Sequence, residues 1–131
     1  MSATPDSIVR DFIAALVDRD IDRACTMVSP DVEYDNVPIG KTHGRDGIRN
    51  TLSGFFALCT SIDWQIIRQT STGDLASGTV LNERDDRVEV HGRTMSLPVA
   101  GVFEIRDGFI TLWRDYFDRE TLVTLMTPPQ N

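Results

Sequence analysis

The stretch from Thr79 to Phe117 reads TVLNERDDRVEVHGRTMSLPVAGVFEIRDGFITLWRDYF. It holds three runs rich in β-branched and aromatic residues, at 79–90, 93–106 and 109–117. The pairs His91-Gly92 and Asp107-Gly108 separate these runs, and two-residue connections of this kind, Asp-Gly above all, are typical of β-hairpins. The stretch therefore predicts three consecutive antiparallel strands.

Outside this stretch the sequence predicts two further strands and four helices. The strands are expected at Val32–Asn36 and Ile62–Thr70. Apolar residues at helical spacing, preceded by capping residues, predict helices at 5–18, from Asp20 to the Ser29-Pro30 pair, at 45–58, and from Asp118 to the Pro128-Pro129 pair. This order predicts a single α+β domain over residues 1–131: a curved, mostly antiparallel sheet with helices packed on one face and a pocket between the layers.

Composition argues against several classes of function. Thirteen basic and twenty acidic residues give a net charge of −7, so we expect no nucleic-acid partner. No apolar stretch approaches the roughly 20 residues of a membrane span, so no membrane partner is expected either. Residues 1–11 lack the basic segment and apolar run of a signal peptide, which favours a cytoplasmic location. Cys25 and Cys59 lie among apolar residues, which predicts buried thiols rather than a disulfide.

Alternation along the predicted strands places polar residues on the side facing the helices. Successive side chains of a strand point to opposite faces, so residues of one parity share a face. On each of three strands this inward face combines apolar or aromatic residues with polar ones. The polar residues expected to point into the pocket are Tyr34, Asn36, Arg84, Asp86 and Asp115.

Buried charges of this kind must be paired, because an isolated charge in an apolar environment is costly. One arginine can hold two carboxylates through its planar set of N–H groups. A neutral cluster then contains one ionised and one protonated aspartate, which favours one carboxyl group as a base and the other as an acid. From the residues alone, a buried ion network that only fixes strand register remains an equal alternative. The sequence shows no metal-ligand spacing, and His43 and His91 are expected in solvated loops.

The motifs Tyr34-x-Asn36, Arg84-x-Asp86 and WRDYFD at 113–118, in this order and spacing, resemble the limonene-1,2-epoxide hydrolase family over almost the whole chain. The resemblance implies a cone-shaped, nuclear-transport-factor-like fold, a homodimer and catalysis without cofactor or metal. It also implies that Asp115 deprotonates a water held by Tyr34 and Asn36, that Asp86 protonates the epoxide oxygen, and that Arg84 bridges the two carboxyls. The chain departs from the family pattern at none of these five positions.

The implied reaction is the one-step addition of water to a small apolar epoxide, of a terpene or cycloalkene, giving a vicinal diol without a covalent intermediate. The residues expected to contact the substrate are Ile13, Leu16, Phe55, Val88, Leu97, Val99, Phe117 and Leu122. Two alternatives remain: an isomerase or polyketide cyclase on the same fold, and a non-catalytic ligand-binding module. An isomerase needs no water-holding pair beside Asp115, and a binding module has little reason to bury three ionisable groups.

Overall fold

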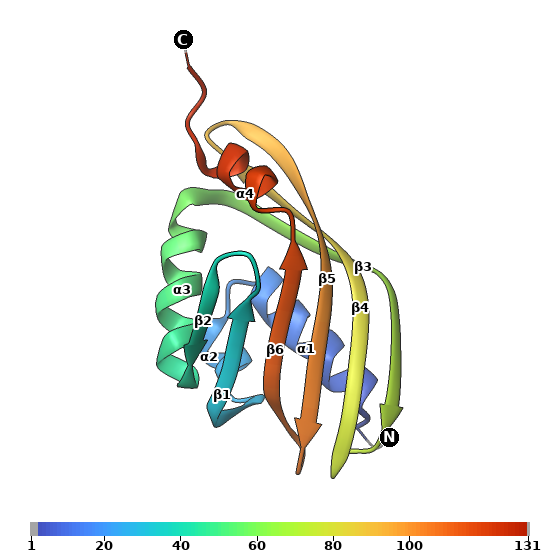
Figure 1. Ribbon diagram of the computed structural model, residues 1–131. Helices are drawn as coiled ribbons and strands as arrows, with labels where there is room; N and C mark the ends of the chain where they lie inside the picture. Colours follow the sequence, from blue (N-terminus) through green and yellow to red (C-terminus); the bar gives the residue numbers. More distant parts are fainter. Residues whose placement is uncertain (1–2, 131) are drawn as a thin grey trace.

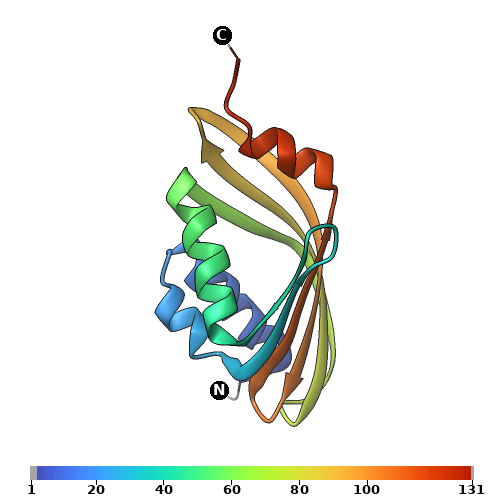
Figure 2. The same cartoon turned by 60° about the vertical axis from the view of Figure 1, so that its left-hand side comes forward.

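The computed structural model describes residues 3–130 and consists of one curved sheet with helices on its concave face. The elements in chain order are α1 (Pro5–Val17), α2 (Ile21–Cys25), β1 (Val28–Asn36), β2 (Gly40–His43), α3 (Gly44–Leu58), β3 (Cys59–Gly73), β4 (Ser77–Val90), β5 (Arg93–Arg106), β6 (Phe109–Phe117) and α4 (Arg119–Met126). The six strands lie in the order β2-β1-β6-β5-β4-β3 (Figure 1). Figure 2 shows α1, α2 and α3 on one side of the sheet, with α4 crossing one end of it.

The three strands that the opening stretch predicts are present and antiparallel. β4 pairs with β5 through Asn82↔Gly101, and β5 pairs with β6 through Gly101↔Asp115. Both hairpin connections have positive φ at each of their two residues: 54° and 76° at His91-Gly92, 49° and 82° at Asp107-Gly108. This conformation matches the twist of the flanking strands, so the turns bring the strands into this register.

β1 joins the other edge of β6 in parallel, the one parallel pairing in the sheet of the described residues. Its register places Tyr34 opposite Trp113 and Asn36 opposite Asp115. Because side chains alternate along both strands, the polar ends of β1 and β6 face the same space. This pairing connects the N-terminal half of the chain to the polar residues of β6.

The helices bury their apolar faces against the concave side of the sheet. Thr4 begins α1 with a capping box, in which its hydroxyl accepts from the Ser7 backbone and the Ser7 side chain accepts from the Thr4 backbone. Phe12 of α1 meets Trp113 of β6 edge to face, with ring centroids 5.0 Å apart. Asp118 begins α4 by accepting from the Thr121 backbone, as the sequence predicts.

Several sequence predictions about the bounds and number of the elements were wrong. The second helix ends at Cys25, and Ser29-Pro30 lies inside β1, which begins at Val28 rather than Val32. Pro30 is tolerated because the pairing of β1 with β6 is irregular between Val28 and Glu33, where no ladder hydrogen bond is required of it. β2 was not predicted, because its four residues are polar and mostly exposed at the edge of the sheet. β3 is longer than expected, from Cys59 to Gly73.

Cys25 and Cys59 are buried, free thiols, as predicted. Within residues 3–130, no helix has the length and hydropathy needed to cross a membrane. The same residues contain no cluster of three or more His, Cys, Asp or Glu side chains able to hold a metal ion.

Candidate active site

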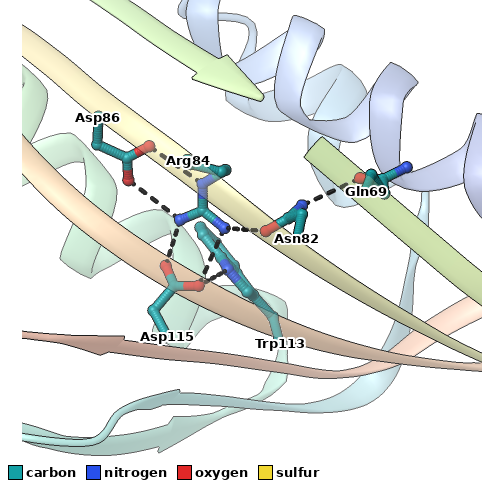
Figure 3. A network of polar contacts seen from close by, with 6 residues as sticks. All are labelled: Gln69, Asn82, Arg84, Asp86, Trp113 and Asp115. Carbon is teal, nitrogen blue, oxygen red and sulfur yellow. Dashed lines mark hydrogen bonds and ion pairs between the residues drawn. The ribbon is translucent and has the colours of Figure 1, made fainter. Parts of the chain in front are cut away.

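Arg84 lies at the centre of a buried polar cluster and is fully shielded from solvent. Its Nε and Nη2 donate to the two carboxylate oxygens of Asp86, each over 3.0 Å. Nη1 and Nη2 donate to the two oxygens of Asp115 over 3.2 and 2.8 Å. Nη1 also donates to Oδ1 of Asn82 over 3.1 Å (Figure 3). All five N–H groups of the guanidinium therefore have an acceptor, and the side chain is held in one orientation.

A glycine on β5 makes this cluster possible. Arg84 is on β4 and Asp115 on β6, so the guanidinium must cross the face of β5 to reach the carboxylate. Gly101 is the β5 residue at this crossing. A Cβ there would lie 2.5 Å from Nη1 of Arg84 and 2.6 Å from Oδ1 of Asn82, too close for any side chain.

Asp115 is held from a second side by an indole. Nε1 of Trp113 donates to Oδ1 of Asp115 over 2.9 Å. The Trp113 ring is fully buried and stacks on Tyr34 with centroids 4.0 Å apart, so its position is fixed by packing. Asp115 thus accepts three hydrogen bonds, two from a cation and one from a neutral donor, so its carboxylate is held in one orientation.

Asp86 is in a different environment, although it shares the same arginine. Within the described part of the chain, its carboxylate accepts from Arg84 alone. Burial raises the pKa of Asp86 to about 6, because the attraction of Arg84 is insufficient to offset desolvation and the negative charge of Asp115 adds to it. Of the two carboxyl groups, Asp86 is therefore the one whose pKa is raised toward neutral pH, which suits it to donate a proton.

The two other polar residues predicted to meet this cluster also face it. Burial and the charge of Asp115 raise the pKa of the Tyr34 hydroxyl, which remains a neutral donor, and a hydrogen bond with Asn36 opposes this shift. Burial alone would lower the pKa of the Arg84 guanidinium, but the charges of Asp115 and Asp86 outweigh it and raise that pKa. The Arg84 guanidinium therefore stays positively charged between the carboxyl groups of Asp86 and Asp115.

A cavity of about 170 Å³ opens beside the cluster. Its polar lining comes mainly from Tyr34, Asn36, Asp86 and Asp115. Its other walls come from α3, α4, β3, β5, β6 and the turn between β1 and β2: Ile39, Thr51, Leu52, Phe55, Trp64, Leu97, Val99, Phe117 and Leu122. The carboxyl groups of Asp86 and Asp115 thus face an otherwise largely apolar chamber.

Five of the eight residues expected to contact a substrate lie on this wall: Phe55, Leu97, Val99, Phe117 and Leu122. Ile13, Leu16 and Val88 do not. All three are buried in the hydrophobic core instead, Ile13 and Leu16 on α1 and Val88 on β4.

Sequence reasoning missed several residues of the site. Asn82 has the same strand parity as Arg84, and that signal was available in the sequence. Thr51 and Leu52 lie one helical turn before Phe55 on α3. Ile39 had no usable signal, because it belongs to the turn before the unpredicted strand β2.

Chemically, the arrangement offers a base and an acid to one bound molecule. Asp115 can accept a proton and Asp86 can donate one, while Arg84 keeps the two groups a fixed distance apart. Tyr34 and Asn36 add neutral hydrogen-bonding groups on the side of Asp115, suited to orienting a water. Such a site fits addition of water to a bond whose leaving atom needs protonation.

The chain is similar to known proteins both in sequence and in structure. Residues 3–127 match the family model of the limonene-1,2-epoxide hydrolase catalytic domain. The chain is 33% identical over 110 residues to epoxide hydrolase EphG of Mycobacterium tuberculosis, a match that covers 84% of this chain and 70% of that protein.

Solved structures also resemble the chain. An epoxide hydrolase of M. tuberculosis described as similar to the limonene-1,2-epoxide hydrolases superimposes with a TM-score of 0.70 at 30% identity, over 89% of this chain and 84% of that one. A hypothetical protein from Catenulispora acidiphila with a ketosteroid isomerase-like fold superimposes with a TM-score of 0.80 at 22% identity, over 97% and 96% of the two chains. The second likeness shows the fold alone.

Proposed function

Since the chain belongs to the limonene-1,2-epoxide hydrolase family, we propose that it adds water to a small apolar epoxide and releases a vicinal diol. The observation that carries the proposal is the pair Asp86 and Asp115, joined by Arg84 and lining one apolar cavity. No other pair of buried carboxyl groups occurs in the described part of the chain.

In the proposed reaction, Asp115 takes a proton from a water oriented by Tyr34 and Asn36. The water oxygen attacks one epoxide carbon, and the carbon–oxygen bond on that carbon breaks. Asp86 gives its proton to the departing oxygen, so the product is a neutral diol. The proton gained by Asp115 and the proton lost by Asp86 balance, and proton exchange within the cluster or with solvent restores the starting state.

The magnitudes suit this chemistry. A positioned base and a positioned acid each typically contribute about 10²–10⁴-fold to a rate. The pKa of Asp86, about 6, lies close to neutral pH, where a general acid combines adequate protonation with a useful tendency to donate. Fixed placement of the water and the epoxide adds the benefit of orientation.

The cavity favours a substrate with little polarity besides the epoxide. Its wall opposite the polar residues is made of aliphatic and aromatic side chains, with Thr51 the one hydroxyl among them. Small terpene and cycloalkene epoxides match its apolar lining. The family further implies a homodimer, and we extend that expectation, together with a cytoplasmic location, to this chain.

The test is to incubate the protein with limonene-1,2-epoxide and, separately, with cyclohexene oxide, and to measure the diol by chromatography. We expect diol formation well above the spontaneous rate, with Asp115→Asn as the inactive control. Binding of either epoxide without diol would favour a ligand-binding module. Isomerised product without added water would favour an isomerase.

A further inference from the structure

The hydrogen bonds around Arg84 continue beyond the two aspartates toward the surface. Asn82 accepts from Arg84 and donates through Nδ2 to Oε1 of Gln69 on β3, over 3.1 Å (Figure 3). Gln69 in turn donates through Nε2 to Asp6 on α1, at 2.8 Å to Oδ1 and 3.1 Å to the backbone oxygen. Arg10 pairs with the other oxygen of Asp6 over 2.9 Å.

The direction of this chain is fixed from both ends. A guanidinium can only donate, so the side-chain oxygen of Asn82 must face Arg84 and its NH₂ must face Gln69. At the other end, hydrogen bonds from Arg10 and Gln69 lower the pKa of Asp6, which remains an ionised acceptor and requires the NH₂ of Gln69. Neither amide can turn over without losing bonds on both sides.

Asn82 supplies the one acceptor of Arg84 that belongs to neither aspartate. It is buried, with 6% of its surface exposed, and it is not among the residues that line the cavity. Both carboxylates attract the guanidinium toward the cavity, whereas Asn82 holds Nη1 from the opposite side. Gly101 leaves the space in which these groups meet.

We propose that Asn82 is a positioning residue for hydrolysis, anchored through Gln69 and Asp6 to α1, and that it fixes the guanidinium plane on which the acid and base are aligned. This inference rests on the proposed function. Asn82 does not line the cavity, so it acts through Arg84 alone.

A neutral amide is the suitable group at this position. An aspartate there would be a third anion beside one guanidinium and would divide its charge further. The ionisable groups acting on Asp86 are Arg84 and Asp85 on its own strand, Asp115 on β6 and Tyr34 on β1. A further carboxylate on β4 would add to the repulsion and make the Asp86 proton harder to remove.

The experiment compares Asn82→Ala, Asn82→Asp and Gln69→Ala with the parent protein, and uses Glu83→Gln as the matched control. Glu83 is the neighbouring residue on β4, with its side chain half exposed and paired with Arg68 on the outer face. For Asn82→Ala we expect kcat to fall about tenfold to a hundredfold, because the bridge loses its fixed orientation, with KM within about twofold. Gln69→Ala should lower kcat in the same manner but less, and Glu83→Gln should match the parent.

Asn82→Asp distinguishes positioning from simple loss of stability. The alkaline limb of its pH–kcat profile should move to higher pH, and so should the titration of the Asp86 carboxyl carbon followed by NMR in protein labelled at aspartate. An unmoved Asp86 titration, or an Asn82→Ala variant with the parent kcat, would overturn the proposal. A rise in KM alone would also overturn it, since it would make Asn82 a substrate contact.

The readouts separate this inference from the proposed function. If the parent hydrolyses no epoxide, the function fails, while the Asp86 titration in Asn82→Asp still tests the coupling through Arg84. If Asn82→Ala does not fold, Gln69→Ala and Asn82→Asp decide the question by the same kcat and titration criteria.

Discussion

Asp86 and Asp115 are the same residue type on the same arginine, and their surroundings give them different properties. Asp115 receives an additional hydrogen bond from the indole of Trp113, which Asp86 lacks. Asp86 has burial working against its charge, which raises its pKa to about 6. The proposed division into base and acid therefore rests on Trp113, two residues before Asp115 on β6, and on the burial of Asp86 on β4.

The first prediction concerns these two carboxyl groups. Asp115→Asn and Asp86→Asn should each lower kcat for epoxide hydrolysis by at least about 100-fold, because an amide preserves the shape but can act neither as base nor as acid. Circular dichroism should show an unchanged fold. If a variant keeps a rate within about tenfold of the parent, the substituted aspartate is not the base or acid of the reaction.

The second prediction concerns pH. Asp86 must be protonated to act as an acid, so kcat should decline as the pH rises through about 6, the pKa of this group. A pH–rate profile between pH 4 and 9 in the presence of saturating epoxide measures this limb. A profile that stays flat from pH 5 to 9 would contradict the assignment of Asp86 as the proton donor.

At the scale of elements, β5 contributes residues both to the cluster around Arg84 and to the wall of the cavity. Gly101 leaves room for the guanidinium, while Val99 and Leu97, two and four residues earlier on the same face, form part of the apolar wall. The position of an epoxide relative to the water therefore depends on side-chain size at these two positions.

The third prediction follows from this arrangement. Leu97→Ala and Val99→Leu should change the enantiomer ratio of the diol formed from cyclohexene oxide, because a methylene group in a pocket is worth roughly 1–3 kcal/mol. Val102→Ala, on the opposite face of β5, is the control and should leave the ratio unchanged. Chiral chromatography measures the outcome. An unchanged ratio in both cavity variants would mean that the substrate does not contact Leu97 or Val99.

Strand alternation explains how far the sequence alone could go. The hairpins at His91-Gly92 and Asp107-Gly108 fix the register of β4, β5 and β6, so strand parity was enough to assign Arg84 and Asp115 to one face of the sheet. The structure confirms the fold and brings the five polar side chains together. Their catalytic roles stay predictions.

What the sequence could not predict depends on packing between elements. The depth at which α1 lies on the sheet decides that Ile13 and Leu16 are core residues rather than cavity wall. The strand β2 has no hydrophobic pattern, because it is stabilised by pairing with β1 at the sheet edge. The role of Gly101 arises from the approach of side chains on two other strands, which no local pattern records.

At the scale of the whole molecule, the buried cluster links stability to pH. The folded-state pKa of Asp86 lies above its ordinary value, so the protonated form is favoured on folding. The contribution of Asp86 to the free energy of unfolding is fully present below about pH 4. This contribution is lost as the pH rises through about 6. An ionised Asp86 is therefore a destabilising feature retained in the site.

The fourth prediction is that Asp86→Asn gains stability relative to the parent as the pH rises. The difference in the free energy of unfolding should move in favour of the variant between pH 4 and 7, by up to about 3 kcal/mol. Urea denaturation at four pH values in this range measures it. A difference that is constant with pH, or that moves in favour of the parent, would contradict the raised pKa of Asp86.

The most direct test of water activation by Asp115 is a single turnover in ¹⁸O-water with enzyme in excess over epoxide. If Asp115 acts as a base, the new oxygen comes from solvent, and the diol from the first turnover should carry the label completely. If Asp115 attacks carbon itself, the first diol takes its oxygen from the carboxylate and leaves unlabelled. Mass spectrometry of the diol decides between them: full label is the result we predict, and an unlabelled first product would make Asp115 a nucleophile.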